Sequence, residues 1–145
     1  MLLRCMGANI GRKTRVNRTC TVLHPWLFSL GDWSSVGPKV EVYNLGQVSI
    51  GSHTAISQGV YLSAGTHDYL SPHLPLVRSK IHIGDGVWIA AQAFIGPDVS
   101  VGRNALVGAR AVVMSDVPAD MIVAGNPARV IKPRLPNELK TPVAG

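Results

Sequence analysis

Aliphatic residues recur at every sixth position through the second half of the chain. From Ile83 onward the sequence reads IGDGVW, IAAQAF, IGPDVS, VGRNAL, VGARAV and VMSDVP. A small or β-branched apolar residue stands four positions after each of these head residues: Val87, Ala93, Val99, Ala105, Ala111 and Val117. Six is a multiple of the strand period of two, whereas an α-helix would turn successive head residues to different faces. The pattern therefore predicts short strands that point both columns to one side, separated by turns at the glycines that follow the head residues.

Weaker copies of the same unit fill the first half of the chain. Their head residues are Ile10, Val16, Val22, Leu30, Val36, Val42, Ile50, Ile56 and Leu62. One hexapeptide is too short to bury a core, so we expect the units to stack as coils of a solenoid in which each backbone pairs with the coils above and below. Cys20 falls in the small inward column, which favours core packing over reactivity.

The repeat is interrupted where a loop should leave the stack. The step from Leu62 to the next head residue, Ile83, is 21 residues long. It predicts an excursion at about 65–80 from a solenoid domain at 1–132, and the segment 133–145 is expected to be a C-terminal tail because it has no sustained period. Loops on a rigid scaffold are common positions for groups that bind ligands.

Four large apolar residues occupy the sixth position of their units, which strand alternation places outside the stack. They are Trp88, Phe94, Leu106 and Val112. A soluble monomer rarely exposes such a stripe, so it indicates a subunit interface or a groove for a ligand. The alternative is an outer face that the C-terminal segment covers.

Composition narrows the class of protein. The chain has 145 residues, 46% of them hydrophobic and 15% charged, which suits one globular domain with a real core. Two cysteines are too few for a disulfide framework or for a zinc site with paired ligands, so we expect reduced thiols, no metal and a cytoplasmic protein. Since no apolar run is long enough for a signal peptide or a membrane span, a soluble protein is expected, with a peripheral position beside a membrane left open.

The charge is concentrated at the start of the chain. The net charge is +6, and five basic residues precede the first acidic residue, Asp32: Arg4, Arg12, Lys13, Arg15 and Arg18. This balance suits a phosphate-bearing ligand or an anionic surface, although a solvated basic end explains it equally well. No nucleic-acid partner is expected.

Four longer motifs carry a family resemblance. SAGTHDY, IGDGVWIAAQAFIGPDVSVG, VGARAVVMSDVP and AGNPARVI resemble the hexapeptide-repeat acyltransferases, most of all the O-acetyltransferases of colanic acid biosynthesis and more distantly the maltose and galactoside O-acetyltransferases. The resemblance runs from GANIG to VAGNPARVIK, nearly the whole chain. It implies an all-β fold, a left-handed parallel β-helix of triangular section, assembled as a homotrimer. It also implies acetyl-CoA as the acyl donor, held in a groove between neighbouring subunits, and a sugar or glycan precursor as the acceptor.

His67 lies within the predicted excursion. A free imidazole has a pKa of about 6.5, so it can be neutral at physiological pH and take a proton from a sugar hydroxyl that attacks a thioester, with no covalent enzyme intermediate. A histidine in an arbitrary loop is more often structural, but in the GTHDY motif the resemblance implies the catalytic base. Asp68 is a candidate for orienting the ring or binding the acceptor, and a turn residue explains it nearly as well.

The resemblance also implies a donor site. Trp88 corresponds to a tryptophan beside the pantetheine arm, and Ala91 and Ala109 correspond to positions whose backbone amides bond that arm. Arg129 and Lys132, followed by a further arginine at 134, correspond to the basic end that approaches the nucleotide phosphates. Arginine and lysine both suit phosphate. A solvated tail is the alternative for this basic cluster.

The acceptor side departs from the family pattern. An asparagine that helps to bind the acceptor in the galactoside enzymes corresponds to Lys39 here, so a different acceptor pocket is expected, with Lys39, Tyr43 and Asn44 as candidate sugar contacts. The chain also begins almost directly at the first coil, without the N-terminal segment of similar proteins. That difference leaves part of the acceptor site and any membrane association open.

Three other functions compete with O-acetyl transfer. The first is N-acetylation of an amino sugar by the same geometry. The second is a zinc enzyme similar to the γ-class carbonic anhydrases, which would use His67 with His73 or His82, but the spacing of these histidines differs from that class and His82 should point outward. The third is a noncatalytic scaffold that kept the coils and lost the reaction.

Overall fold

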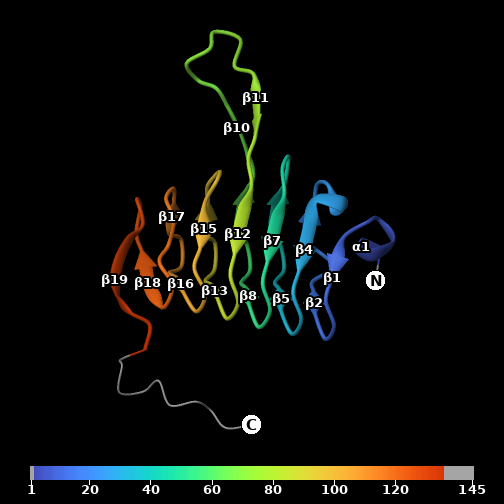
Figure 1. Ribbon diagram of the computed structural model, residues 1–145, viewed down its shortest axis with the longest axis vertical. Helices are drawn as coiled ribbons and strands as arrows, with labels where there is room; N and C mark the ends of the chain where they lie inside the picture. Colours follow the sequence, from blue (N-terminus) through green and yellow to red (C-terminus); the bar gives the residue numbers. More distant parts are fainter. Residues whose placement is uncertain (1, 136–145) are drawn as a thin grey trace.

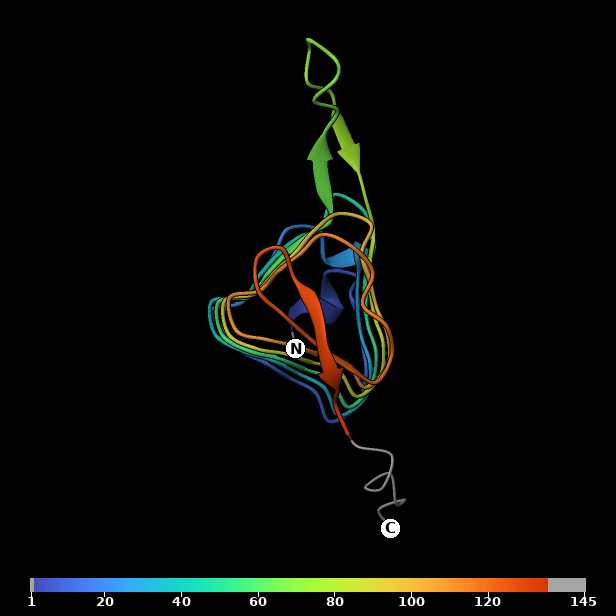
Figure 2. The same cartoon turned by 90° about the vertical axis from the view of Figure 1, so that its left-hand side faces the viewer.

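The chain folds into a parallel β-solenoid of about six coils (Figure 1). The computed structural model describes residues 2–135. Three parallel sheets form the sides of a triangular section, which Figure 2 shows end on. Within this range the chain forms, besides strands, one short helix, α1 (Leu2–Cys5), and one 3-10 turn, η1 (Pro25–Leu27). The all-β solenoid predicted from the six-residue period is therefore confirmed.

Each of the first five coils contributes one strand to each sheet, and β18 and β19 extend the second sheet. The first sheet contains β1 (Asn9–Ile10), β4 (Phe28–Leu30), β7 (Val48–Ile50), β12 (Ile81–Ile83) and β15 (Ser100–Val101). The second sheet contains β2 (Arg15–Val16), β5 (Ser35–Val36), β8 (Ala55–Ile56), β13 (Trp88–Ile89), β16 (Leu106–Val107), β18 (Met121–Ala124) and β19 (Arg129–Pro133). The third sheet contains β3 (Thr21–Val22), β6 (Glu41–Tyr43), β9 (Tyr61–Ser63), β14 (Phe94–Ile95) and β17 (Val112–Val113).

The two apolar columns of the repeat form the core. Every head residue from Ile83 to Val113, and every small residue from Val87 to Val117, is at most 5% exposed. The strands pair in register, so that Ile83 lies between Ile50 and Val101 in neighbouring coils. Equivalent side chains thus stack on one another along the whole solenoid, and the core is a continuous apolar rod.

The glycines after the head residues have a different role from the one predicted. The left-handed turn residue comes three positions after the head, as at His53 and Asn104, which have φ of 54° and 55°. Gly84 instead lies where the next coil passes close to it, because a Cβ there would come within 2.8 Å of the backbone nitrogen of Arg103. The turns therefore lie two residues after the predicted positions. Gly51, Gly84 and Gly102 instead leave room for the backbone of the adjacent coil.

The predicted excursion is a two-stranded antiparallel hairpin. β10 (Gly65–His67) pairs with β11 (Leu76–Arg78), and the hairpin projects from the corner between the third and first sheets (Figures 1 and 2). The coils on either side are undisturbed, since β7 and β12 pair directly in register. The six-residue period gives no sign of this pairing, because the two strands of the hairpin pair with each other outside the stack.

The end of the described chain folds back on the solenoid. β19 runs antiparallel to β18, the last strand that follows the coils. The guanidinium of Arg134 then donates hydrogen bonds to the main-chain oxygens of Gly86 and Asn104 at 2.6 and 3.2 Å. Of the predicted tail at 133–145, the segment 136–145 lies outside the described residues. Within residues 2–135, no helix has the length and apolar character needed to cross a membrane.

Candidate functional site

His67 ends β10 and is exposed to solvent on the hairpin. Its Nδ1 lies 2.5 Å from the main-chain oxygen of Leu74. A carbonyl oxygen only accepts hydrogen bonds, so Nδ1 must carry the proton in this contact. The neutral ring then has its lone pair on Nε2, which is the atom that can accept a proton from a substrate.

The loop between β10 and β11 is held by Asp68. Its carboxylate accepts a hydrogen bond from the backbone nitrogen of Leu70 at 3.0 Å, and its own backbone nitrogen donates to the oxygen of Pro75 at 3.0 Å. These bonds close the turn that presents Leu74 to His67. Asp68 therefore fixes the loop, while a contact between Asp68 and an acceptor stays a prediction.

The base of the hairpin is packed tightly against the preceding coil. The oxygen of Ala64 accepts hydrogen bonds from the backbone nitrogens of Gly46 and Ser79, both at 3.2 Å. A Cβ at Gly46 would come within 1.9 Å of the oxygen of Ser79, so only glycine fits there without movement of the backbone. The hairpin thus leaves the solenoid in a fixed position.

Trp88 lies on the outer face of the second sheet, as the alternation predicted. Its side chain is 44% exposed, and its indole Nε1 donates a hydrogen bond to Oγ of Ser57 in the preceding coil at 3.0 Å. Strand pairing places Trp88 between Ala55 and Leu106. The indole is therefore fixed at its polar edge while part of its surface stays open to a ligand.

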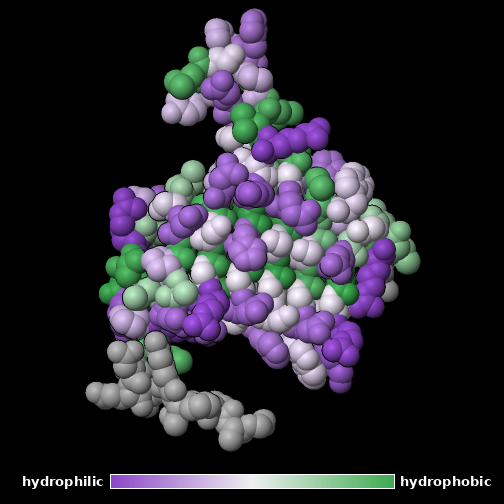
Figure 3. Space-filling model, in the orientation of Figure 1, coloured by the Kyte–Doolittle hydropathy of each residue, from purple (hydrophilic) through white to green (hydrophobic). Residues whose placement is uncertain are grey.

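The outer face of the second sheet changes character along the solenoid. Its outward residues, in strand order from β2 to β19, are Arg15, Ser35, Ala55, Trp88, Leu106, Ile122 and Lys132. Basic residues stand at both ends of this face. The residues before Trp88 are the small Ser35 and Ala55, and those after it are the apolar Leu106 and Ile122. By contrast, the first sheet carries Ser49, His82 and Ser100 outward, and Figure 3 shows hydrophilic and neutral side chains over that face.

The other donor-site candidates follow Trp88 toward the C-terminal end. Ala91 is half-buried and Ala109 is exposed, and they occupy the corner after the second sheet in consecutive coils. The oxygen of Ala91 accepts a hydrogen bond from the backbone nitrogen of Arg110 at 2.9 Å. Arg129 and Lys132 are both exposed in β19 at the end of the same sheet.

The three acceptor candidates lie in different surroundings. Lys39 is exposed at a coil corner, and Tyr43 is half-buried with its ring centroid 6.4 Å from that of Tyr61. Asn44 is completely buried, and its amide bonds both the backbone nitrogen and the backbone oxygen of His24, at 2.9 and 2.7 Å. Asn44 therefore joins two coils, and sugar contacts from Lys39 and Tyr43 stay predictions.

One chain does not bring His67 and Trp88 together. The hairpin leaves the corner between the third and first sheets, whereas Trp88 lies on the second sheet, the side of the triangle that does not meet that corner (Figure 2). The hairpin also exposes large apolar side chains: Tyr69 (83%), Leu70 (82%), Leu74 (52%) and Leu76 (59%). A hydrophobic hairpin that projects from a rigid body is typical of a contact with another chain.

The histidines do not form a metal site within one described chain. His82 points outward as predicted, and its Nδ1 lies 2.9 Å from Oγ of Ser49. No three His, Cys, Asp or Glu side chains in residues 2–135 come together as a group that could hold a metal ion. Because a shared site would need ligands from two subunits, direct metal analysis is the test of the zinc alternative.

Two contacting residues were missed in the sequence. Leu74 orients His67 through its backbone, and no side-chain pattern identifies such a role. Ser57 was detectable in principle, because it lies beside the strand that pairs with Trp88 and a serine there can meet the indole nitrogen. That inference requires knowing that β8 pairs with β13, so that Ser57 lies near Trp88.

The described chain is a parallel solenoid with an oriented histidine on a projecting hairpin, and the outer face of its second sheet runs from Trp88 through apolar residues to Lys132. Residues 80–115 match the family described as bacterial transferase hexapeptide (six repeats). The chain is 40% identical over 137 residues to the putative colanic acid biosynthesis acetyltransferase WcaF of Escherichia coli (strain K12), covering 94% of this chain and 75% of that protein. The chain therefore belongs to the hexapeptide-repeat acyltransferases, and the predicted family and enzyme class are confirmed.

Solved structures agree with this assignment. A hexapeptide-repeat acetyltransferase from Vibrio cholerae superposes with a TM-score of 0.88 at 27% identity, covering 93% of this chain and 78% of that one. The same Vibrio enzyme has been solved in complex with acetyl coenzyme A. A galactoside acetyltransferase in complex with coenzyme A superposes with a TM-score of 0.86 at 27% identity, covering 91% of this chain and 68% of that one.

Proposed function

We propose that the protein transfers the acetyl group of acetyl-CoA to a hydroxyl of a sugar or polysaccharide precursor, with His67 as the general base. The observation that carries the proposal is the hydrogen bond from Nδ1 of His67 to the oxygen of Leu74, which leaves Nε2 to accept a proton. The similarity to WcaF and to galactoside acetyltransferase supports a saccharide acceptor.

The reaction follows from that tautomer. Nε2 of His67 takes the proton of the acceptor hydroxyl as the oxygen attacks the thioester carbonyl, and a C–O bond forms. The C–S bond then breaks, and the thiolate leaves with the proton returned from His67, so the products are the acetyl ester and free CoA. The Leu74 oxygen stabilises the imidazolium in between, because it accepts the hydrogen bond from Nδ1. General-base help of this kind is worth about 10²- to 10⁴-fold in rate.

We place the donor along the outer face of the second sheet, beginning at Trp88, and call this face the donor groove. The partly exposed indole offers an apolar surface to the pantetheine arm, and the small side chains of Ala91 and Ala109 leave room for it against the corner of the coils. Arg129 and Lys132 at the far end of the sheet suit the nucleotide phosphates. This arrangement supports a donor that lies along the solenoid with its thioester near Trp88.

The active enzyme is proposed to be a homotrimer with its sites between subunits. His67 and Trp88 lie at different sides of the triangle within one chain, so a complete site needs the hairpin of one subunit and the second sheet of its neighbour. A head-to-tail contact of this kind closes into a ring under threefold symmetry. The exposed apolar side chains of the hairpin support the contact.

Calorimetric titration of acetyl-CoA tests the donor site. The wild-type protein is expected to bind with a Kd in the micromolar range, and Trp88→Ala is expected to weaken binding by about tenfold or more, because an aromatic contact and its buried area are lost. Trp33→Ala is the matched control, since Trp33 is 57% exposed at a corner away from the groove. A folded protein that fails to bind acetyl-CoA would refute the proposal, and zinc analysis would then test the metal alternative.

Mass spectrometry of the product tests the acceptor. Incubation of acetyl-CoA with a sugar and with the corresponding amino sugar should give an alkali-labile ester on the sugar hydroxyl. Transfer to the amine alone would replace O-acetylation with the N-acetyl alternative. Absence of acetyl-CoA binding together with absence of transfer to either acceptor would support the noncatalytic scaffold.

A further inference from the structure

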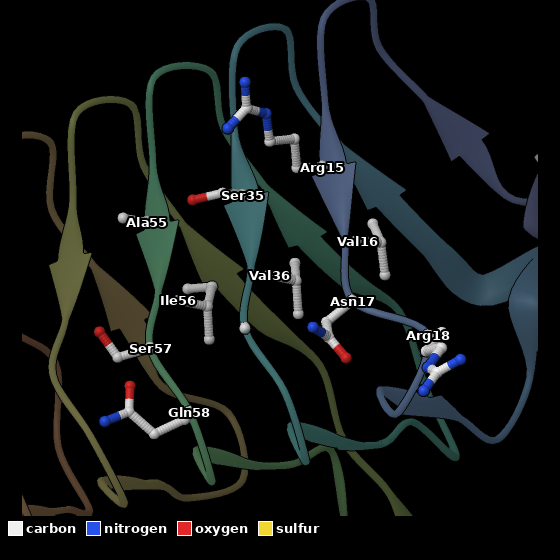
Figure 4. Close-up of a pocket in the computed structure, with 11 residues that line it drawn as sticks. Arg15, Val16, Asn17, Arg18, Ser35, Val36, Ala55, Ile56, Ser57 and Gln58 are labelled. Atoms are coloured by element: carbon white, nitrogen blue, oxygen red, sulfur yellow. The ribbon is translucent and has the colours of Figure 1, made fainter.

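A pocket lies on the outer face of the second sheet, across the first three coils (Figure 4). Its volume is about 590 Å³, within the usual range for small-molecule sites. Its polar lining side chains are Arg15, Asn17, Arg18, Ser35, Ser57 and Gln58. Figure 4 shows the two arginines at different ends of the pocket, and we call this site the arginine pocket.

The charge of the arginine pocket is unbalanced. No acidic residue lines it, and both arginines are exposed. Within residues 2–135 the salt bridge that forms is between Arg12 and Asp32, outside the pocket, and neither Arg15 nor Arg18 has a carboxylate partner. A pair of guanidinium groups in a shared depression favours an anion, which arginine can bind through two parallel hydrogen bonds.

The arginine pocket adjoins the proposed donor groove at Ser57. This residue lines the pocket and also accepts the hydrogen bond from the indole of Trp88. Arg15 and Lys132 lie three strands from Trp88 in opposite directions, about 14 Å each at the spacing of paired strands. A donor whose phosphates lie near Lys132 therefore leaves the side with Arg15 for the second substrate.

The lining suits a saccharide better than a second apolar ligand. Ser35, Ser57, Asn17 and Gln58 offer hydroxyl and amide groups that can both donate and accept hydrogen bonds, which matches the hydroxyls of a sugar. Of the aliphatic lining residues, Val36 and Ile56 belong to the buried core, and Val16 and Ala55 are half-buried. The combination of hydroxyl-binding groups with two cations suits a sugar that carries negative charge.

We propose that the arginine pocket binds an anionic group of the acceptor, so that the enzyme acetylates an acidic saccharide in preference to a neutral one. The anion is a carboxylate, as in a uronic acid, or a phosphate, as in a sugar phosphate, and both offer paired oxygens to arginine. This inference rests on the proposed O-acetyl transfer and adds the charge of the acceptor. Arg15 and Arg18 are the specificity-determining residues.

Steady-state kinetics with matched acceptors tests the proposal. The probes are p-nitrophenyl β-D-glucuronide, p-nitrophenyl β-D-glucoside and glucose 1-phosphate. The glucuronide or the phosphate is expected to have a KM at least about tenfold lower than the glucoside, and Arg15→Gln or Arg18→Gln should each raise that KM about tenfold, since a hydrogen bond to a charged group is lost. Comparison of the glucuronide with the phosphate shows which anion the pocket prefers.

The control is Arg12→Gln, which removes a positive charge from the same coil outside the arginine pocket. It should leave the KM of every acceptor unchanged. Equal KM values for acidic and neutral acceptors, with no effect of either pocket variant, would overturn the proposal. A second contrary outcome is that Arg15→Gln or Arg18→Gln raises the Kd of acetyl-CoA but not the Kd of acetyl-dephospho-CoA. The arginines would then bind the 3′-phosphate of the donor. A change in oligomeric state caused by either variant would assign the arginines to a subunit contact instead.

A measurement of acceptor binding distinguishes failure of this proposal from failure of the proposed O-acetyl transfer. If the wild-type protein acetylates none of the three probes, the proposed acceptor chemistry fails, and saturation-transfer NMR still tests the pocket with the same compounds. A signal from the glucuronide or the phosphate that Arg18→Gln removes and Arg12→Gln keeps supports an anionic-saccharide site. Absence of that signal, or an equal signal from the glucoside, overturns it.

Discussion

Nδ1 of His67 donates a hydrogen bond to the main-chain oxygen of Leu74 at 2.5 Å, so the orientation of the ring depends on the backbone of a residue seven positions later. Leu74 has a φ of 46°, in the left-handed region that residues other than glycine, asparagine and aspartate rarely adopt. The surrounding loop, closed by Asp68, maintains this conformation. The position of the proposed base is therefore set by local backbone geometry.

Substitution of Leu74 tests that dependence. Leu74→Val should lower kcat by about tenfold, because a β-branched residue resists the left-handed conformation and would displace the oxygen that holds His67. The KM for acetyl-CoA and the melting temperature should change little, since the loop lies outside the coils. Leu74→Gly should retain most of kcat because glycine accepts this conformation freely.

The control for Leu74 is Leu70→Val in the same exposed loop. Leu70 is not among the residues with a positive φ, and valine keeps an apolar side chain for the proposed subunit contact, so this substitution should leave kcat unchanged. Equal losses for the valine and glycine variants of Leu74 would show that its side chain, and not its backbone, matters.

Mixed trimers test whether a site is shared between subunits. His67→Ala and Trp88→Ala homotrimers should each be impaired, but subunits mixed through unfolding and refolding should regain activity, because some sites then combine an intact hairpin with an intact groove. If each site spans two subunits, random assembly from equal amounts leaves about one quarter of the sites with both His67 and Trp88 intact. Activity of the mixture no higher than the average of the parents would place both residues in one chain's site.

The base of the hairpin should tolerate no side chain at Gly46. Gly46→Ala places a methyl group against the oxygen of Ser79, so the backbone of one of the two segments must move. We expect a loss of about 1–3 kcal/mol in the free energy of unfolding, because overpacking in a rigid region has that cost. Thermal unfolding measures it, with Gln47→Ala at the neighbouring exposed position as the control; unchanged stability would mean that the hairpin base is pliable.

The two cysteines should differ in reactivity. Burial raises the pKa of the Cys20 thiol to about 11, and Cys20 packs against the core, whereas Cys5 is exposed. Alkylation by iodoacetamide at pH 8, followed by peptide mass mapping, should therefore modify Cys5 well before Cys20, because the thiolate is the reactive form. Equal rates in the native protein would contradict this, and equal rates in urea provide the control.

The same pKa has a consequence for stability. The thiol of the unfolded chain ionises near pH 8.5, below the folded value of about 11, so the unfolded state loses its proton first as the pH rises. The contribution of Cys20 is complete below about pH 8.5 and is lost as the pH passes through about 11. Urea unfolding at pH 8 and 10.5 should show a larger alkaline loss for the wild type than for Cys20→Ala.

The repeat made most of the fold predictable because it is a local rule repeated many times. The inward columns, such as Ile83 with Val87, follow from alternation alone, and the core confirms them. The outward position of Trp88 follows from the same rule. The hairpin was predicted only as an interruption, because its strands pair with each other outside the stack and show no six-residue period.

The site was less predictable because its decisive contacts depend on the third dimension. Leu74 acts through its backbone, and a leucine gives no sign of a left-handed conformation. Arg15 and Arg18 were visible as part of a basic N-terminal run, but the pocket that they share with Ser57 exists only once three coils are stacked. Conversely, Asn44 is a plausible sugar contact in sequence, and only the structure shows that it joins two coils.

The reversal of the chain at β19 has a consequence for the behaviour of the protein in a crowded cell. A stack of similar parallel coils ends in a strand edge that could pair with another copy and grow into a fibre. β19 occupies the edge of β18 in the opposite direction, and it carries Arg129 and Lys132 on its exposed surface. Charged side chains on an edge strand oppose pairing with a further chain. The strand whose basic residues we propose to bind the donor phosphates thus also protects the C-terminal edge of the second sheet against pairing with another copy.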